Sequence, residues 1–335
     1  MRIVGSKKML IILSVILFIS ISLLGCGGNE KNESKKKEDA VMELTFATGA
    51  EGGTWGVIGN AIADYMQREI DNVRVTVIYG GGVSNLIGIS NGQIDIAFGY
   101  GPTALEARQG LGAFKDTGPI KNVRQLAKLY TSPFQIAVRG DSGVYKVEDL
   151  KGKGFSPTIR GFTSEAIAEM VLKVHGMTYD DLSRVEFVDQ PEGAALTQDG
   201  HIAGFCPLAA VPAPAIQELF ASSRGGRIVP IAEDKIEAIS EINSGYIKYV
   251  IPAGSYRGQT EDVLTIGVPD VLYVREDLPD ELVTKILEIM FNKAKDLEAI
   301  HVSMKDFNLE EAPEDLGTPL HSAAEAFYKA KGALK

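Results

Sequence analysis

Three glycine-containing turns, each directly before an expected helix, are the positions where this sequence is best suited to bind an anion. They contain Gly52 and Gly53, Gly80 to Gly82, and Gly161. The first N–H groups of a helix lack helical partners and the helix dipole is positive there, so a carboxylate or phosphate is stabilised at such a terminus. A single turn of this kind is as often a tight connection that binds nothing. Three of them could converge on one cleft, because ligands of open α/β sheets bind beyond the carboxyl ends of the strands.

Arg160 directly precedes the third turn and adds a positive charge. A guanidinium can hold a carboxylate through two parallel hydrogen bonds. The alternative is an exposed loop arginine that is only solvated. The two interpretations predict different effects of Arg160→Ala on ligand binding: about 2 to 5 kcal/mol for a desolvated charge pair, and under about 0.5 kcal/mol for a solvated side chain.

Residues typical of catalytic or metal sites do not form a group in this sequence. The histidines His175, His201, His301 and His321 have no metal-ligand spacing, and no nucleophile, zinc or phosphate-loop motif is present. Cys206 lies among apolar residues and is expected to be a buried thiol. We therefore expect a protein that binds its ligand rather than converting it, without a metal or cofactor.

The first turn lies between an expected strand at 44–48 and an expected helix. In the strand Leu44, Phe46 and Thr48 alternate with Thr45 and Ala47. Thr54 is a favourable N-cap for the helix. Apolar residues recur at the three-and-four spacing of one helix face, namely Trp55, Ile58, Ile62 and either Tyr65 or Met66. This pattern is typical of a helix packed on a sheet.

The alternation of strand and helix continues along the chain. We expect strands at 73–79, 94–98, 134–139, 185–188, 202–206 and 265–274, and helices at 85–90, 147–152, 164–175, 191–199, 212–222, 279–301 and 319–331. Thr163 is the expected N-cap of the helix at 164–175. Strands separated by such helices predict a mostly parallel sheet covered by helices. Roughly 295 residues follow the N-terminal region, which is more than a single hydrophobic core of modest size usually contains, so two lobes are expected.

The N-terminus has the features of a secretory signal. Three basic residues precede an apolar run from Met9 to Leu24, and the sequence Leu-Leu-Gly at 23–25 leads to Cys26. The 16-residue run is short for a membrane span, although an uncleaved anchor is the alternative. We expect a signal peptide at 1–25, lipidation of Cys26 and a polar tether at 26–42. The folded part is then extracytoplasmic and anchored to the cell membrane.

The net charge argues against nucleic-acid binding. Removal of residues 1–25 leaves 31 Lys and Arg against 44 Asp and Glu, a net charge of −13. Such a surface repels nucleic acid, and no basic stripe interleaved with aromatic residues is present.

Six segments of the sequence, taken in chain order, form a series of short motifs. They are GAEGGTW (49–55), GGGVSNL (80–86), NGQIDIAF (91–98), VEDLKGK (147–153), VPAPAIQEL (211–219) and IPAGSYRGQTEDVLTIGV (251–268). Together they resemble the motifs of the TAXI family, the solute receptors of tripartite ATP-independent periplasmic (TRAP) transporters. The resemblance covers roughly residues 43 to 300.

This resemblance implies a type II periplasmic-binding-protein fold, an α/β fold of two lobes joined by two crossovers. The lobes close over a ligand, which then passes to a membrane permease. We expect lobe I at 43–132 and 276–335, and lobe II at 133–275. Characterised relatives are associated with glutamate, 2-oxoglutarate or similar small carboxylates, so the expected ligand is a small organic anion.

The expected site combines the glycine turns with aromatic side chains. Its residues are Gly53, Thr54, Trp55, Ser84, Asn85, Tyr100, Tyr130, Arg160, Gly161, Phe162, Thr163 and Tyr256. For each aromatic residue a position in the core is an equal alternative. Several of the turns depart from the residues usual in the family, so the resemblance does not identify the anion.

The expected function is therefore a monomeric receptor for a small anion that works with a TRAP permease. Two alternatives stay open. One is a ligand-sensing lipoprotein that reports to a signalling partner, and the other is an enzyme on the same fold.

Overall fold

The computed structural model describes residues 41–49 and 53–334. The predicted signal peptide, Cys26 and nearly all of the predicted tether lie outside these residues. Of the helices that are described, none has the length and apolar character to cross a membrane. The first strand begins at Met42, the last residue of the predicted tether.

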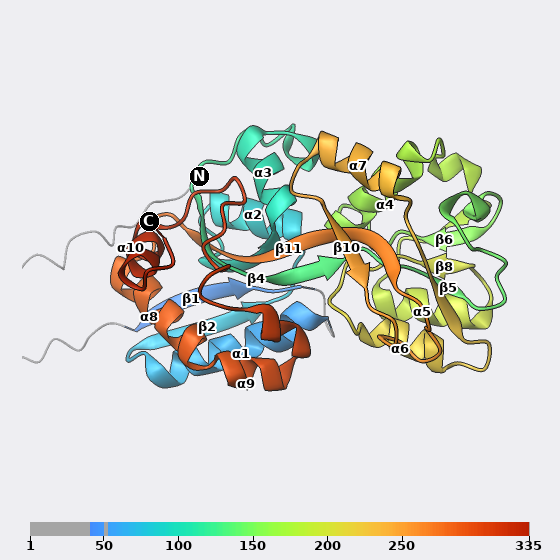
Figure 1. Cartoon of the computed structure of the whole chain (residues 1–335). Helices are drawn as coiled ribbons and strands as arrows, with labels where there is room; N and C mark the ends of the chain where they lie inside the picture. The colour runs from blue at the N-terminus through green and yellow to red at the C-terminus, as the bar shows by residue number, and fades with distance from the viewer. Residues whose placement is uncertain (1–40, 50–52, 335) are drawn as a thin grey trace, which may run out of the picture. The chain divides into compact units, whose positions relative to one another are not determined.

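The first sheet has six strands, of which β4 and β11 are the longest and extend toward the second sheet (Figure 1). Its strands are β1 (Met42–Ala47), β2 (Val73–Ile78), β3 (Ile96–Tyr100), β4 (Val123–Pro133), β10 (Ile247–Ile251) and β11 (Val263–Arg275). The order is β10-β11-β3-β1-β2, and β4 also pairs with β11. Strand β1 is parallel to β2 and β3, whereas β11 is antiparallel to β3, β4 and β10.

The second sheet has five short strands in the order β7-β6-β8-β5-β9. They are β5 (Ile136–Arg139), β6 (Gly154–Ser156), β7 (Arg184–Val185), β8 (Gly204–Phe205) and β9 (Gly226–Val229). Strand β6 is parallel to β7 and β8, and β5 is antiparallel to β8 and β9. Two helix-flanked sheets confirm the predicted α/β fold class. The sheets are mixed rather than mostly parallel, because β5 and β11 run against their neighbours.

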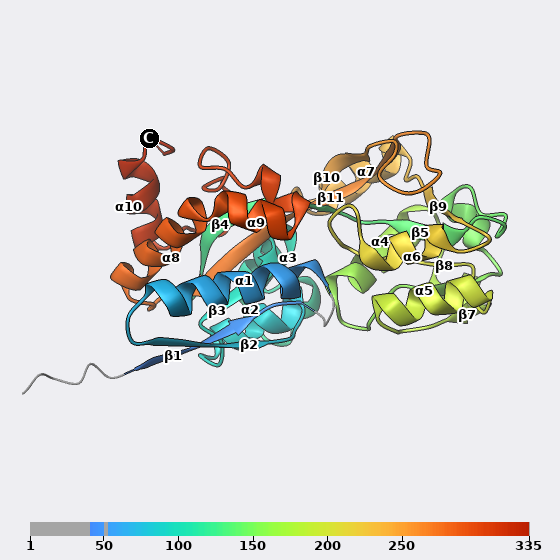
Figure 2. The same ribbon diagram turned by 90° about the horizontal axis from the view of Figure 1, so that it is seen from below.

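Helices cover both sheets (Figures 1 and 2). With the first sheet lie α1 (Thr54–Glu69), α2 (Gly82–Ser90), α3 (Gly101–Gln109), α8 (Asp280–Asn292), α9 (Ala294–Ile300) and α10 (Ser322–Ala330). The other α-helices are α4 (Thr163–Val174), α5 (Gln190–Asp199), α6 (Pro214–Ala221) and α7 (Glu233–Ile242). The described residues also include the short 3-10 helices η1 (Gly112–Phe114), η2 (Val147–Leu150), η3 (Tyr179–Asp181) and η4 (Val302–Asp306). Helix α1 packs against α8 and α9, and α2 packs against α3.

The apolar face predicted for the first helix is confirmed. Trp55, Ile58, Ile62 and Met66 are all buried. The N-cap prediction was wrong by one residue here and in α4: Gly53 caps α1 and Phe162 caps α4, while Thr54 and Thr163 are already helical. Both caps have extended backbone and neither helix has a side-chain cap.

Several elements differ from the sequence prediction. The helix expected at 279–301 is interrupted at Lys293, which separates α8 from α9. Strand β4 and helices α3 and α7 were not predicted. Strand β4 was missed because it has no exposed residues, and its half-buried residues do not alternate regularly with the buried ones around register shifts in its pairing with β11.

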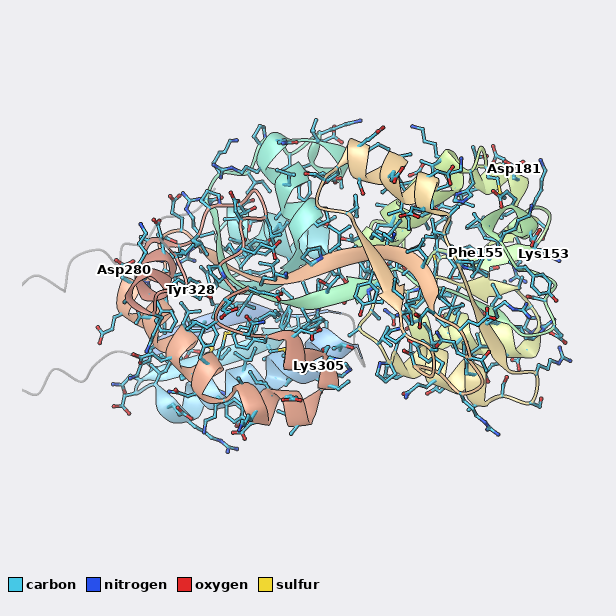
Figure 3. All side chains as sticks on the ribbon, in the orientation of Figure 1. Lys153, Phe155, Asp181, Asp280, Lys305 and Tyr328 are labelled. Atoms are coloured by element: carbon cyan, nitrogen blue, oxygen red, sulfur yellow. The ribbon has the colours of Figure 1, made fainter. Side chains whose placement is uncertain are left out.

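Side chains fill the space between the layers (Figure 3). Phe155 of β6 is buried in the second sheet, and Tyr328 of α10 is buried at the other end of the molecule. The Tyr328 hydroxyl donates to the Leu126 carbonyl of β4 at 3.0 Å. One apolar cluster includes residues of both sheets.

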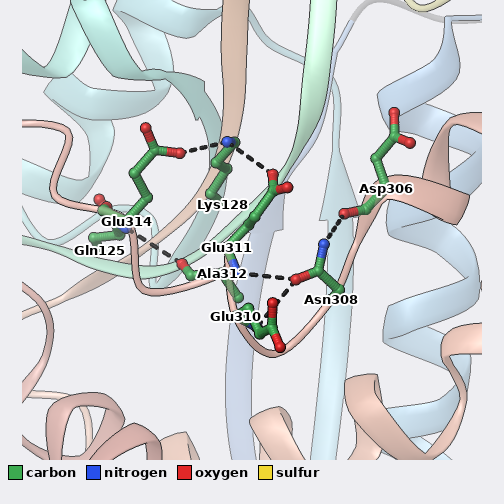
Figure 4. Close-up of polar contacts among 8 residues, drawn as sticks. All are labelled: Gln125, Lys128, Asp306, Asn308, Glu310, Glu311, Ala312 and Glu314. Atoms are coloured by element: carbon green, nitrogen blue, oxygen red, sulfur yellow. Dashed lines mark hydrogen bonds and ion pairs between the residues drawn. The ribbon is translucent and has the colours of Figure 1, made fainter. Parts of the chain in front are cut away.

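The edge of β4 is covered by the segment 306–321 (Figure 4). The Lys128 N–H donates to the Ala312 carbonyl at 2.8 Å, and the Lys128 ammonium pairs with Glu311 and Glu314. The Gln125 amide nitrogen donates to the Glu314 carbonyl at 2.8 Å. These bonds hold a strand that also forms part of the candidate site.

Candidate functional site

A cavity of roughly 300 Å³ lies between elements of the first and second sheets. This volume suits a small molecule rather than a polymer. The turns before α1, α2 and α4, the ends of β3 and β4, the start of α5, the loop after β8 and helix α6 form its wall. The lining residues on which the site depends are Gly53, Thr54, Trp55, Gly80, Gly81, Gly82, Tyr100, Tyr130, Ser132, Phe162, Thr163, Ser164, Asp189 and Glu218.

Three helix N-termini without side-chain caps meet at this cavity. They belong to α1, α2 and α4, whose N-caps are Gly53, Gly81 and Phe162. All three caps line the cavity, and so do the first helical residues Thr54 and Thr163. Because uncapped N–H groups and positive dipole ends point to one place, the arrangement can bind an anion.

The start of α5 differs from these three termini. Asp189 caps α5 by accepting a hydrogen bond of 2.9 Å from the Glu192 N–H. It therefore supplies a carboxylate to the cavity wall rather than a free N–H group. Helix α6 begins at Pro214, which has no N–H to offer.

Aromatic side chains form the wall on the first-sheet side. Trp55, Tyr100 and Tyr130 line the cavity and are each less than a tenth exposed. The ring centroids of Trp55 and Tyr100 are 4.5 Å apart. The Tyr130 hydroxyl is buried without a hydrogen-bond partner, which gives the wall one unsatisfied polar group. These three residues are thus buried as core residues are, and they also line the cavity, so the alternative of a ligand contact stays open.

A buried carboxyl lies behind this wall. Asp270 of β11 is fully buried, and its register partners are Tyr100 of β3 and Tyr130 of β4. Its Oδ1 accepts a hydrogen bond of 2.5 Å from Trp55 Nε1, while its Oδ2 has no partner.

The environment of Asp270 favours its neutral form. Burial raises the pKa of Asp270 to about 8, and hydrogen bonds from Ser132 and Trp55 oppose this shift only in part. Burial, followed by the Asp270 charge, raises the pKa of Tyr100 and of Tyr130 well above the usual value. At neutral pH the site therefore contains a carboxylic acid and two neutral phenols.

Elements on the two sides of the cavity touch through small groups. Thr163 Oγ1 of α4 lies 3.2 Å from Thr103 Oγ1 of α3. A Cβ atom at Gly82 would lie 2.8 Å from Thr163 Oγ1, and one at Gly81 would lie 3.2 Å from the Phe162 ring. Glycine at these two positions thus permits the close approach of α2 to α4.

The structure brings seven of the predicted site residues to the cavity. They are Gly53, Thr54, Trp55, Tyr100, Tyr130, Phe162 and Thr163. Ser84 and Asn85 lie just beneath the wall. Ser84 Oγ accepts from the Gly81 N–H at 3.0 Å, and the Asn85 amide donates to the carbonyls of Thr48 and Phe98, each at 2.9 Å. Both side chains shape the turn instead of lining the cavity.

Tyr256 is placed away from the cavity, in contrast to the expectation. Its hydroxyl donates to Gln135 Oε1 at 2.6 Å and accepts from the Ala213 N–H at 3.0 Å. Its ring packs on Phe220 with centroids 5.1 Å apart. The apolar neighbours of this tyrosine place it in the core of the second sheet region.

Arg160 and Gly161 are also outside the cavity lining. The Arg160 side chain is exposed, and its guanidinium lies 3.8 Å from the centre of the Phe187 ring. The Gly161 N–H donates to Glu165 Oε2 at 3.3 Å. Arg160 thus stacks on an aromatic ring, an arrangement that needs no ligand, and its pairing with a ligand carboxylate stays a prediction.

Asp270, Ser132 and Asp189 were not identified from the sequence. A signal for Asp270 existed, because it is the one acidic residue in the apolar stretch from Ile266 to Val274. A charged residue in such a strand is buried and needs a partner. No comparable signal marks Ser132 or Asp189, whose positions depend on the pairing of distant segments.

The charges of the wall differ from the expected ones. The described lining residues include the acids Asp189 and Glu218, and Lys, Arg and His are absent among them. Within residues 41–49 and 53–334, no group of acidic, histidine or cysteine side chains could hold a metal ion. An anion would therefore be held by N–H groups and hydroxyls, without a cationic side chain from the described wall.

Comparisons with known proteins agree with this architecture. A family model described as the NMT1-like family matches residues 46–332. The solved structure of the periplasmic binding protein BugD is similar with a TM-score of 0.53 at 12% identity, over 86% of this chain and 93% of that chain. The protein MatC of Rhodopseudomonas palustris, solved with bound malate, is similar with a TM-score of 0.52 at 12% identity, over 87% of this chain and 96% of that chain. At this identity the two structures show a shared fold.

Proposed function

This chain belongs to the NMT1-like family, and we propose that it is an extracytoplasmic receptor that captures a small organic anion and delivers it to a membrane permease. The shared fold with periplasmic binding proteins supports a binding role. The expected lipid anchor at Cys26 would hold such a receptor at the membrane, next to its permease.

The observation that carries this proposal is the convergence of three uncapped helix N-termini on one cavity. Thr54 of α1, Gly82 of α2 and Thr163 of α4 all line it. One ligand carboxylate binds at these N–H groups, and Trp55 and Tyr100 pack on the carbon skeleton. A volume of roughly 300 Å³ is sufficient for a compact molecule such as glutamate, 2-oxoglutarate or malate.

The motif resemblance to TAXI receptors supports a TRAP permease as the membrane partner. The lobe limits at residues 132 and 276 are part of the same proposal. The pairing of Asp270–Val274 with β3 favours a second crossover slightly earlier, where Gly267–Pro269 of β11 lie opposite Thr131–Pro133 of β4. Closure about these crossovers would then be driven by the higher affinity of the closed form for the ligand.

A panel of small carboxylates tests this function by thermal unfolding. A ligand at one hundred times its Kd should stabilise the folded protein by about 2.7 kcal/mol. We expect at least one dicarboxylate or amino acid of the panel to raise the melting temperature, and simple amines to have no effect. Stabilisation by none of the carboxylates would contradict the proposal.

The two alternatives have their own tests. A signalling lipoprotein would bind the same ligand, and the gene of a TRAP permease beside that of the receptor would argue against it. An enzyme would consume the ligand, so mass spectrometry of the ligand pool after incubation distinguishes conversion from retention.

A further inference from the structure

We propose that Asp270 links protonation to ligand capture: when an anion binds at the N-termini of α1, α2 and α4, any Asp270 that is ionised takes up a proton from solvent, so that the bound form contains the neutral acid. This inference rests on the proposed function, because it needs an anionic ligand. Asp270 then acts as a positioning residue behind the cavity wall rather than as a ligand contact.

The Asp270 carboxyl is separated from the proposed ligand position by the side chain of Trp55. Trp55 Nε1 donates to Asp270 Oδ1 at 2.5 Å, and Trp55 itself lines the cavity. Tyr100 and Tyr130 are the register partners of Asp270 on the two neighbouring strands, and both line the cavity as well. The carboxyl is thus in contact with the wall while it is shielded from water.

The groups that face Asp270 compensate its charge only in part. Trp55 of α1 and Ser132 of β4 hydrogen bond to it, and Tyr100, Tyr130 and Tyr249 are the titratable groups whose pKa its charge raises. Among the described residues Asp270 has no ion pair with Lys, Arg or His. The negative charge of a ligand in the cavity would therefore repel an ionised Asp270 in a medium of low dielectric constant.

This repulsion has a defined thermodynamic consequence. The pKa of Asp270 in the free protein is about 8, so part of the protein carries an ionised Asp270 at pH 8. An anion in the cavity raises this pKa further, and the ionised fraction takes up a proton on binding. If only the neutral form binds, affinity should fall about tenfold between pH 7 and pH 9.

Trp55 provides a direct readout, because it is the only tryptophan of the chain. The Trp55 indole is hydrogen-bonded to Asp270, so its fluorescence should respond to the protonation of that carboxyl. Because Trp55 also lines the cavity, its fluorescence should respond to a bound ligand as well. A titration from about pH 6 to pH 10 brackets the pKa of about 8. The titration is done on the free protein and with glutamate, 2-oxoglutarate or malate as probes.

We expect an inflection near pH 8 in the free protein, and an upward shift of this inflection with a saturating probe. Asp270→Asn mimics the neutral acid, so it should lack the inflection and bind the probe with an affinity that does not vary between pH 7 and pH 9. The matched control is Asp277→Asn, which removes an exposed carboxylate just beyond β11. It should keep both the inflection and its shift.

An inflection that persists in Asp270→Asn, or one that a bound probe leaves in place, would overturn the proposal. Should this variant fail to fold, calorimetry of the wild-type protein in two buffers of different ionisation enthalpy gives the number of protons taken up. A value of zero between pH 7 and pH 9 would also overturn it. If no carboxylate binds, the proposed function fails and this inference falls with it, whereas binding without proton uptake removes this inference alone.

Discussion

The indole nitrogen of Trp55 lies 2.5 Å from Oδ1 of Asp270, and this bond joins the first turn of α1 to the middle of β11. The two residues are separated by 215 positions in the sequence. Trp55 faces the cavity, while Asp270 is fully buried between strands β3 and β4. Asp270 is therefore in direct contact with a residue that lines the candidate ligand site.

Asp270 should make a contribution to stability that decreases as the pH rises from about 4 to about 8. The pKa of Asp270 is about 8 in the folded state and about 3.9 in an unfolded chain. The folded state thus binds more protons than the unfolded state in this window, and the free energy of unfolding decreases with pH.

Asp270→Asn should remove this contribution, which is at most about 1.4 kcal/mol per pH unit. Urea denaturation of both proteins at several pH values measures the difference. Equal slopes for the wild-type protein and the variant would show that Asp270 does not titrate in this range.

Gly82→Ala should weaken ligand binding by hindering the approach of α2 to α4. The added Cβ would lie 2.8 Å from Thr163 Oγ1 and 3.1 Å from Tyr100 Cδ2. Overpacking of this kind costs about 1 to 3 kcal/mol, which corresponds to about fivefold or more in affinity. Calorimetry with a carboxylate that binds the wild-type protein measures this loss.

Gly101→Ala is the matched control for Gly82→Ala. Gly101 is the first residue of α3, and a Cβ there meets Leu316 Cδ1 at an ordinary distance of 3.4 Å. We expect wild-type affinity for this variant. The same loss in both variants would mean that the approach of α2 to α4 is not the cause.

Asn85→Ala should destabilise the fold rather than change ligand contacts. The Asn85 amide donates to the carbonyls of Thr48 and Phe98, and the side chain is 1% exposed. Loss of two buried hydrogen bonds costs about 2 to 4 kcal/mol. Denaturation measures this change, and an unchanged midpoint would show that these bonds do not stabilise the turns.

Arg160→Ala should change ligand affinity by less than about 0.5 kcal/mol. The guanidinium stacks on Phe187 and the side chain is exposed, so its removal leaves the cavity wall intact. Calorimetry decides between this result and the loss of about 2 to 5 kcal/mol that a desolvated ion pair with the ligand would give. A loss of about 2 to 5 kcal/mol would show that Arg160 contributes to ligand binding.

Much of the architecture was predictable because its signals are local. The apolar spacing of Trp55, Ile58, Ile62 and Met66 predicted α1, and the glycines before the helices predicted the turns at the cavity. These signals depend on a few neighbouring residues, so tertiary contacts do not alter them.

The rest of the site depends on pairing between distant segments. Asp270 lies beside Tyr100 and Tyr130 only because β11 lies between β3 and β4. The contacts of Tyr256 and Arg160 could not be predicted for the same reason, since their partners Gln135 and Phe187 are remote from the motifs that contain them. Motif spacing identifies a turn, but it does not show which side of the turn faces the ligand.

Native mass spectrometry of the protein as purified tests the central claim most directly. The account predicts one small organic anion bound per chain, lost after denaturation and refolding, and restored unchanged when the same compound is added. A protein that never retains an anion and binds no carboxylate of the panel would contradict the account. Conversion of the added compound into a product would contradict it equally.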